Sequence, residues 1–163
     1  MYKEMTSSRV LIFGCGNVLM GDDGFGPAVV KKLRQKYRLP PDAHVEDVGT
    51  SIRDLLFNIA LLPQRPERII VMDAVDKPGR SPGEVFEIDL DAIPESKAVD
   101  YSIHQCPTSN LLKEIRDLCG VEVTVVAAQV AKENEQVGPG LSEPVRGAVR
   151  EAAERIAKMV KAR

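Results

Sequence analysis

The chain has 163 residues, of which 44% are hydrophobic and 28% charged. This composition is ordinary for a globular protein, and the length is close to the ~150 residues of an average domain. We therefore expect one domain over residues 1–163, with its core at about residues 9–160. The net charge of −2 and the aromatic content of 4%, with no tryptophan, argue against a nucleic-acid-binding surface.

The compartment is predicted from what the sequence lacks. Residues 1–8 show neither the apolar stretch nor the cleavage site of a secretory signal peptide. No segment approaches the ~20 apolar residues that span a bilayer. The three cysteines, Cys15, Cys106 and Cys119, form no Cys-x-x-Cys motif and cannot all pair. We expect a protein of the reducing cytoplasm that does not bind a membrane.

Strand patterns occur in five segments, at residues 10–13, 44–48, 69–72, 84–90 and 121–128. The first, third and fifth are largely continuous apolar runs, which is typical of strands buried on both faces of a sheet. The third is expected to end at Asp73. The fourth alternates between apolar and polar residues, which predicts an edge or antiparallel strand with one wetted face.

Helix patterns lie between these strands, at residues 27–37, 51–60, 108–118 and 142–159. Ser51 and Asp54 have the spacing of a helix capping box. The last helix repeats apolar residues every three or four positions and should face the core. The alternation of strands and helices predicts an α/β fold. We expect a twisted, mostly parallel five-stranded sheet with one antiparallel edge strand and helices on both faces.

The stretch GCGNVLMGDDGFG, residues 14–26, links the first strand to the first helix. Its first two glycines fit a dinucleotide-binding G-x-G-x-x-G loop, but the sixth position is Leu19. Asp22 and Asp23 would also repel a pyrophosphate near the helix start. The alternative is an acidic helix start that the helix dipole stabilises.

Asp23, Asp73 and His104 form a second candidate site. Two of them follow predicted strands, and open α/β sheets bind ligands at the carboxyl ends of their strands. Two carboxylates and an imidazole suit a divalent ion such as manganese, iron, nickel or zinc. The alternatives are that Asp73 caps a turn and that His104 makes an ordinary loop hydrogen bond.

Two further residues carry weaker signals. Cys106 follows His104 by two positions, so the two side chains would share one side of an extended segment. A cysteine nucleophile is thus conceivable, although nothing marks Cys106 as a thiolate. His44, which follows the Pro40-Pro41-Asp42 break, is expected at the surface.

The sequence resembles the hydrogenase maturation proteases, endopeptidases that trim the C-terminal extension from the large subunit of nickel–iron hydrogenases. The resemblance extends over about residues 9–160. The matching motifs are Gly14-Cys-Gly-Asn17, Gly21-Asp-Asp-Gly24, Val71-Met-Asp-Ala74, Pro82-Gly-Glu84 and Ile103-His-Gln105.

By this resemblance, Asp23, Asp73 and His104 are the metal ligands and the candidate catalytic residues. The nickel would be carried by the precursor rather than held by the protease, and the site would also accept other divalent metals. The resemblance thus implies a hydrogenase large-subunit precursor as partner, cleaved only after nickel insertion. The glycine loop would then be acidic because it meets a cation. Asp22 would assist as a neighbour of the ligands or as a general base.

The chain departs from the family pattern at two positions. Many relatives have a Gln-Pro pair where this chain has Gln129-Val130, and some have glutamate at the position of Asp23. The polar segment 132–140 is a candidate for contact with the precursor tail. Two other functions stay open, namely a non-catalytic metal-sensing or chaperone module that binds the precursor, and a nucleotide-binding domain.

Overall fold

The computed structural model describes residues 2–92, 109–132 and 137–161. Its α-helices are α1 (Tyr2–Ser7), α2 (Phe25–Lys36), α3 (Ile52–Ala60), α4 (Ser109–Cys119) and α5 (Glu143–Lys161). Its strands are β1 (Val10–Cys15), β2 (Ala43–Gly49), β3 (Arg68–Val75), β4 (Val85–Glu87) and β5 (Glu122–Gln129). Two short 3-10 helices are η1 (Gly21–Gly24) and η2 (Leu90–Ala92). Within the described ranges, no helix combines the length and the hydropathy that crossing a membrane requires.

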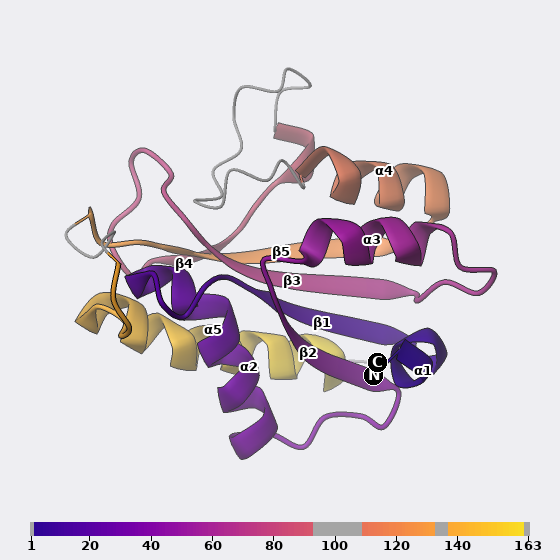
Figure 1. Cartoon of the computed structure of the whole chain (residues 1–163), viewed down its shortest axis with the longest axis horizontal. Coiled ribbons are helices and arrows are strands. Elements are labelled where there is room, and N and C mark those ends of the chain that lie inside the picture. Colours follow the sequence, from indigo (N-terminus) through magenta and orange to yellow (C-terminus); the bar gives the residue numbers. More distant parts are fainter. Residues whose placement is uncertain (1, 93–108, 133–136, 162–163) are drawn as a thin grey trace.

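The five strands form one sheet in the order β2-β1-β3-β5-β4 (Figure 1). Strand β1 pairs in parallel with both β2 and β3, and β3 pairs in parallel with β5. Strand β4 lies antiparallel to β5 at one edge. The predicted fold class, a mostly parallel sheet with one antiparallel edge strand, is confirmed.

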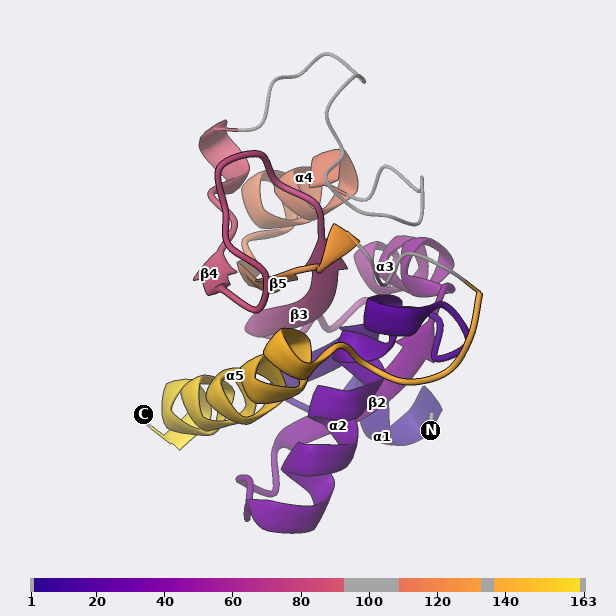
Figure 2. The same cartoon turned by 90° about the vertical axis from the view of Figure 1, so that its left-hand side faces the viewer.

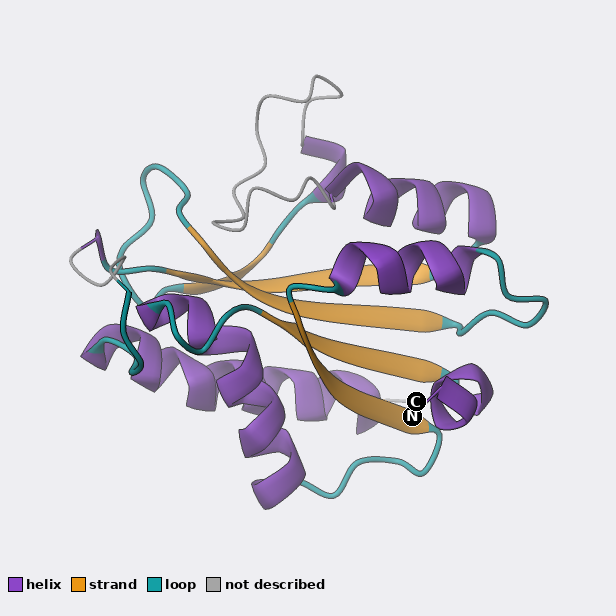
Figure 3. Cartoon of the chain, viewed as in Figure 1, coloured by secondary structure: helices purple, strands orange, loops and turns teal. Residues whose placement is uncertain are grey.

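Helices cover both faces of the sheet, with α3 and α4 on one side and α2 and α5 on the other (Figure 3). Alternate residues of one strand enter two separate cores. In β3, Ile70 and Met72 pack with residues of α2 and α5, whereas Ile69 and Val71 pack with residues of α3 and α4. Burial on both faces explains why the central strands are continuous apolar runs.

Two strands differ from their predicted extents. Strand β3 does not end at Asp73, because parallel pairing with β5 continues to Val75, opposite Gln129. Asp73 therefore lies inside a strand and does not cap a turn. Strand β4 stops at Glu87, well before the predicted residue 90. Val85 and Phe86 are buried and Glu87 is exposed, so the face that Val85 and Glu87 share is wetted only at Glu87.

Local signals failed at two places near helices. Helix α1 was not predicted, yet its Met5 is buried in the core with residues of α3 and α4. The capping box at Ser51 is absent, because the Ser51 side chain makes no capping hydrogen bond to α3. The Ser51 backbone N–H instead donates to the Val48 carbonyl at 3.0 Å.

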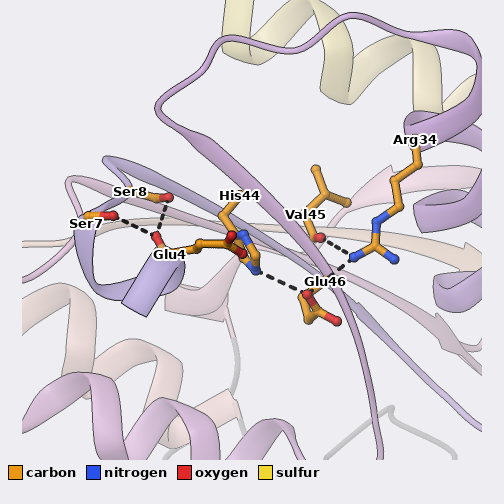
Figure 4. Close-up of polar contacts among 7 residues, drawn as sticks. All are labelled: Glu4, Ser7, Ser8, Arg34, His44, Val45 and Glu46. Atoms are coloured by element: carbon orange, nitrogen blue, oxygen red, sulfur yellow. Dashed lines mark hydrogen bonds and ion pairs between the residues drawn. The ribbon is translucent and has the colours of Figure 1, made fainter. Parts of the chain in front are cut away.

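The outer edge of β2 is covered by side chains (Figure 4). Arg34 of α2 donates to the Val45 carbonyl at 2.6 Å and lies 3.3 Å from Glu46. His44 Nε2 lies 3.1 Å from the same glutamate, and the His44 side chain is only 14% exposed. His44 is therefore a half-buried residue at the edge of the sheet rather than a fully exposed one. Charged side chains that lie over an edge strand in this way protect it from pairing with strands of other chains.

Candidate functional site

The candidate site lies at the carboxyl ends of the parallel strands, the end that Figure 2 turns toward the viewer. Here β1 ends at Cys15, and the chain passes through residues 17–20 into η1 and then α2. Helix α2 packs against β1 and β3, and η1 also contacts β3. The turn that carries Asp23 is therefore in contact with the strand that carries Asp73.

The glycines of this stretch allow the first turn of α2 to lie directly on the end of β1. A Cβ atom on Gly14 would stand 2.5 Å from the Gly26 carbonyl oxygen and 2.6 Å from Val30 Cγ2. A Cβ atom on Gly26 would collide with the backbone of Cys15 and Met72. Gly16 has a φ of +136°, which a residue with a side chain rarely adopts. Close backbone approach thus accounts for the glycine spacing that resembles a nucleotide loop.

Asp23 is held by its own loop. It is buried in η1, and its Oδ2 accepts a hydrogen bond from the Asn17 backbone N–H at 2.8 Å. The Asp23 N–H donates to the Met20 carbonyl at 3.1 Å. Asp22 and Asp23 lie in the first turn of η1, which runs directly into α2. The acidic helix start that the sequence suggested is therefore found in η1, while the first turn of α2 itself contains no acidic residue.

Asp73 lies on β3 opposite Ala127 of β5 and is 9% exposed. It follows Val71 by two positions, so its side chain leaves the sheet on the side of α3 and α4. Cys15 packs on this same side. Burial raises the pKa of the Cys15 thiol well above its usual value, and the charges of Asp73, Asp47 and Asp23 raise it further. The geometric link between the two aspartates is the contact of η1, which carries Asp23, with β3, which carries Asp73.

The third predicted ligand, His104, lies outside the described residues, as does Cys106. Among the residues that the structure does describe, no group of three or more His, Cys, Asp or Glu side chains is arranged to hold a metal. The ligand set of Asp23, Asp73 and His104 therefore stays a prediction. Two buried carboxylates near one another would favour a cation over an anion at this edge.

Asp22 has a different role from its neighbour. It is 1% exposed, and both of its oxygens accept hydrogen bonds from distant parts of the chain. Oδ1 accepts from the Ser142 N–H at 2.6 Å, and Oδ2 accepts from Ser142 Oγ at 2.8 Å and the Ala131 N–H at 2.9 Å. Asp22 thus anchors both ends of segment 131–142. The structure favours this anchoring role over the predicted general base.

Gln129 and Val130 fix the loop that follows β3. Buried Gln129 accepts from the Lys77 N–H at 2.8 Å and donates to Asp76 at 2.9 Å. The Val130 N–H donates to the Val75 carbonyl at 3.0 Å. A proline at position 130 could not make this bond. Valine at this position therefore keeps a hydrogen bond between the residue after β5 and the end of β3.

Solved structures share this architecture. A [NiFe] hydrogenase maturation protease from Thermococcus kodakarensis superposes with a TM-score of 0.75, at 22% identity, over 99% of both chains. The hydrogenase maturating endopeptidase HybD of Escherichia coli gives a TM-score of 0.73 at 26% identity and covers 94% of this chain and 93% of its own. Fold and site together define an α/β protein with an acidic site at the carboxyl ends of its parallel strands.

Sequence comparison gives the family. A family model described as hydrogenase maturation protease matches residues 27–159. A Methanocaldococcus jannaschii protein named for this activity is 39% identical over 96% of this chain and 99% of its own length. Subunit delta of the coenzyme F420 hydrogenase of Methanothermobacter thermautotrophicus is 30% identical over 91% of this chain and 92% of its own. The chain belongs to the hydrogenase maturation protease family, and its class is that of a peptide-bond hydrolase.

Proposed function

We propose that this protein is a cytoplasmic endopeptidase that removes the C-terminal extension of a nickel–iron hydrogenase large-subunit precursor after nickel insertion. The observation that carries the proposal is the pair of buried carboxylates, Asp23 and Asp73, at the carboxyl edge of a maturation-protease fold. The names of the structurally similar proteins, a [NiFe] hydrogenase maturation protease and a hydrogenase maturating endopeptidase, support it.

In this proposal the nickel arrives with the substrate. Asp23 and Asp73, together with His104, contact the nickel of the loaded precursor through open coordination positions. Oxygen and imidazole ligands suit such an ion. A precursor without nickel gains nothing from buried carboxylates, so metal loading decides which precursor binds. The three residues thereby bring the nickel-bearing part of the precursor to the edge of the sheet, and other divalent ions could take the place of nickel there.

The test is the intact mass of a large-subunit precursor after incubation with this protein, with and without nickel loading. We expect loss of a C-terminal peptide in the nickel-loaded sample alone. Replacing Asp23 or Asp73 with asparagine, or His104 with glutamine, should slow this cleavage by about 100-fold or more, since metal sites lose ~10–100-fold even when only a supporting residue is changed. The matched control is Asp54→Asn, which changes an exposed aspartate on α3.

Three outcomes would contradict the proposal. Full activity in all three site variants would exclude the predicted residues. Equal cleavage with and without nickel would exclude the metal requirement. A stable complex with the loaded precursor and no change in its mass would instead identify a non-catalytic metal-sensing or chaperone module.

A further inference from the structure

Exposed apolar side chains gather beside the candidate site. The structure exposes six large hydrophobic residues among those that it describes, and three of them are Val18, Leu19 and Val137. Their exposed fractions are 53%, 59% and 84%. We call these three residues the apolar rim. Single exposed apolar residues are normal, but several on adjoining loops next to a site indicate an interaction surface.

Backbone hydrogen bonds place the members of the apolar rim together although they are far apart in the sequence. The Gly138 N–H donates to the Leu19 carbonyl at 2.7 Å, and the Gly21 N–H donates to the Gly138 carbonyl at 2.8 Å. Met20 and Gly138 thereby form a parallel bridge. Leu19 and Val137, which precede the two bridged residues, are thereby neighbours.

The apolar rim is continuous with the candidate site. Asn17, which donates to Asp23 Oδ2 at 2.8 Å, immediately precedes Val18. Asp22 anchors segment 131–142, which includes Val137, to the same 3-10 turn. In Figure 2 the orange segment that leads into α5 passes beside the indigo segment that leads into η1. The apolar rim and Asp23 therefore belong to one stretch of chain at this edge of the sheet.

We infer that the apolar rim binds apolar side chains of the precursor polypeptide within a few residues of the bond that is cut. This inference rests on the proposed function and names a subsite for it. The carboxylates supply attraction for the metal, but they offer nothing to an apolar side chain of the precursor. An apolar surface on the same loop supplies that binding through the hydrophobic effect. The occupant is thus a stretch of the large-subunit precursor and not a lipid or a second copy of this chain.

The test is equilibrium binding of the nickel-loaded large-subunit precursor, measured beside its cleavage. The rim variant is Leu19→Ser with Val137→Ser, and the matched control is Leu118→Ser, an 81% exposed residue of α4. We expect the rim variant to bind roughly 10- to 100-fold more weakly, the value for one or two apolar side chains left in water. Cleavage at saturating precursor should stay within about twofold of wild type. The control should bind as wild type does.

A reciprocal change separates this surface from general damage. Serine in place of the apolar residues beside the cut in the precursor should weaken binding to wild type and have little further effect on the rim variant. Unchanged thermal unfolding of the rim variant excludes misfolding. If wild type and the rim variant bind equally, the inference is overturned while the proposed function stands. If wild type binds without cutting and the rim variant binds more weakly, the endopeptidase function fails and the rim stands. Absence of binding by wild type would overturn both.

Discussion

Replacing Asp22 with alanine should destabilise the protein through bonds that join three distant parts of the chain. The change leaves the buried Ala131 N–H without its acceptor, which costs ~1–3 kcal/mol. The two hydrogen bonds from half-buried Ser142 each contribute a further ~0.5–1.5 kcal/mol, since water can replace part of them. The alanine variant also no longer pays the cost of keeping the Asp22 carboxylate away from water, and this offsets part of the loss. We therefore expect a loss of about 3 kcal/mol of the free energy of unfolding, and a fall in Tm of roughly 6–12 °C.

Urea unfolding followed by circular dichroism measures this loss, with the m-value as a check that the transition stays two-state. The matched control is Asp47→Ala, because Asp47 is exposed and accepts a local hydrogen bond from the nearby Gly49 N–H at 3.0 Å. The control should lose less than ~1 kcal/mol. If Asp22→Ala were no less stable than Asp47→Ala, Asp22 would not anchor the loops. A stable but inactive Asp22→Ala would return this residue to the role of general base.

Two more predictions concern the end of β1. Gly14→Ala should cost at least ~3 kcal/mol or prevent folding, since its Cβ would meet the Gly26 carbonyl oxygen at 2.5 Å. Gly147→Ala, on an exposed helical position with no atom within 4 Å of the new Cβ, should raise stability by ~0.5–1 kcal/mol. Equal unfolding curves for the two variants would refute the packing argument. The raised pKa of Cys15 keeps its thiol protonated at neutral and mildly alkaline pH. Iodoacetamide at pH ~8.5 should therefore spare Cys15 in the native protein and modify it after denaturation; labelling of native Cys15 at the rate of half-buried Cys119 would contradict this.

The architecture could be predicted from the sequence because the periodicity of hydrophobic residues and the spacing between strands are local signals. Continuous apolar runs predicted the buried strands, and the rule that ligands bind at strand carboxyl ends predicted the edge of the sheet on which Asp23 and Asp73 both lie. The end of β3 was misplaced because pairing with β5 carries it past the polar Asp73 to Val75. A local pattern contains no information about such a partner strand.

The roles of Asp22 and the glycines could not be predicted for the same physical reason. The acceptor at Asp22 and its donors at Ala131 and Ser142 are 109 and 120 residues apart in sequence. Gly14 and Gly26 look like a phosphate-binding pattern until the backbone approach between α2 and β1 is seen. Sequence reasoning also missed the apolar rim, since Leu19 and Val137 become neighbours only through the bridge at Met20 and Gly138. The signal available was the presence of apolar residues in two otherwise polar loops.

The bonds at Asp22 also determine when this protein can first work during its synthesis. A ribosome releases Asp22 and Asp23 early, but Ser142 emerges 120 residues later, and the α5 layer of the core follows it. Until then the nascent chain contains the acidic turn but lacks Ala131 and Ser142, whose hydrogen bonds hold Asp22 in place. Because domains generally fold as units, the acidic edge is completed only with the last part of the chain. Translation thus delays activity, and a prematurely terminated product lacks the fixed edge.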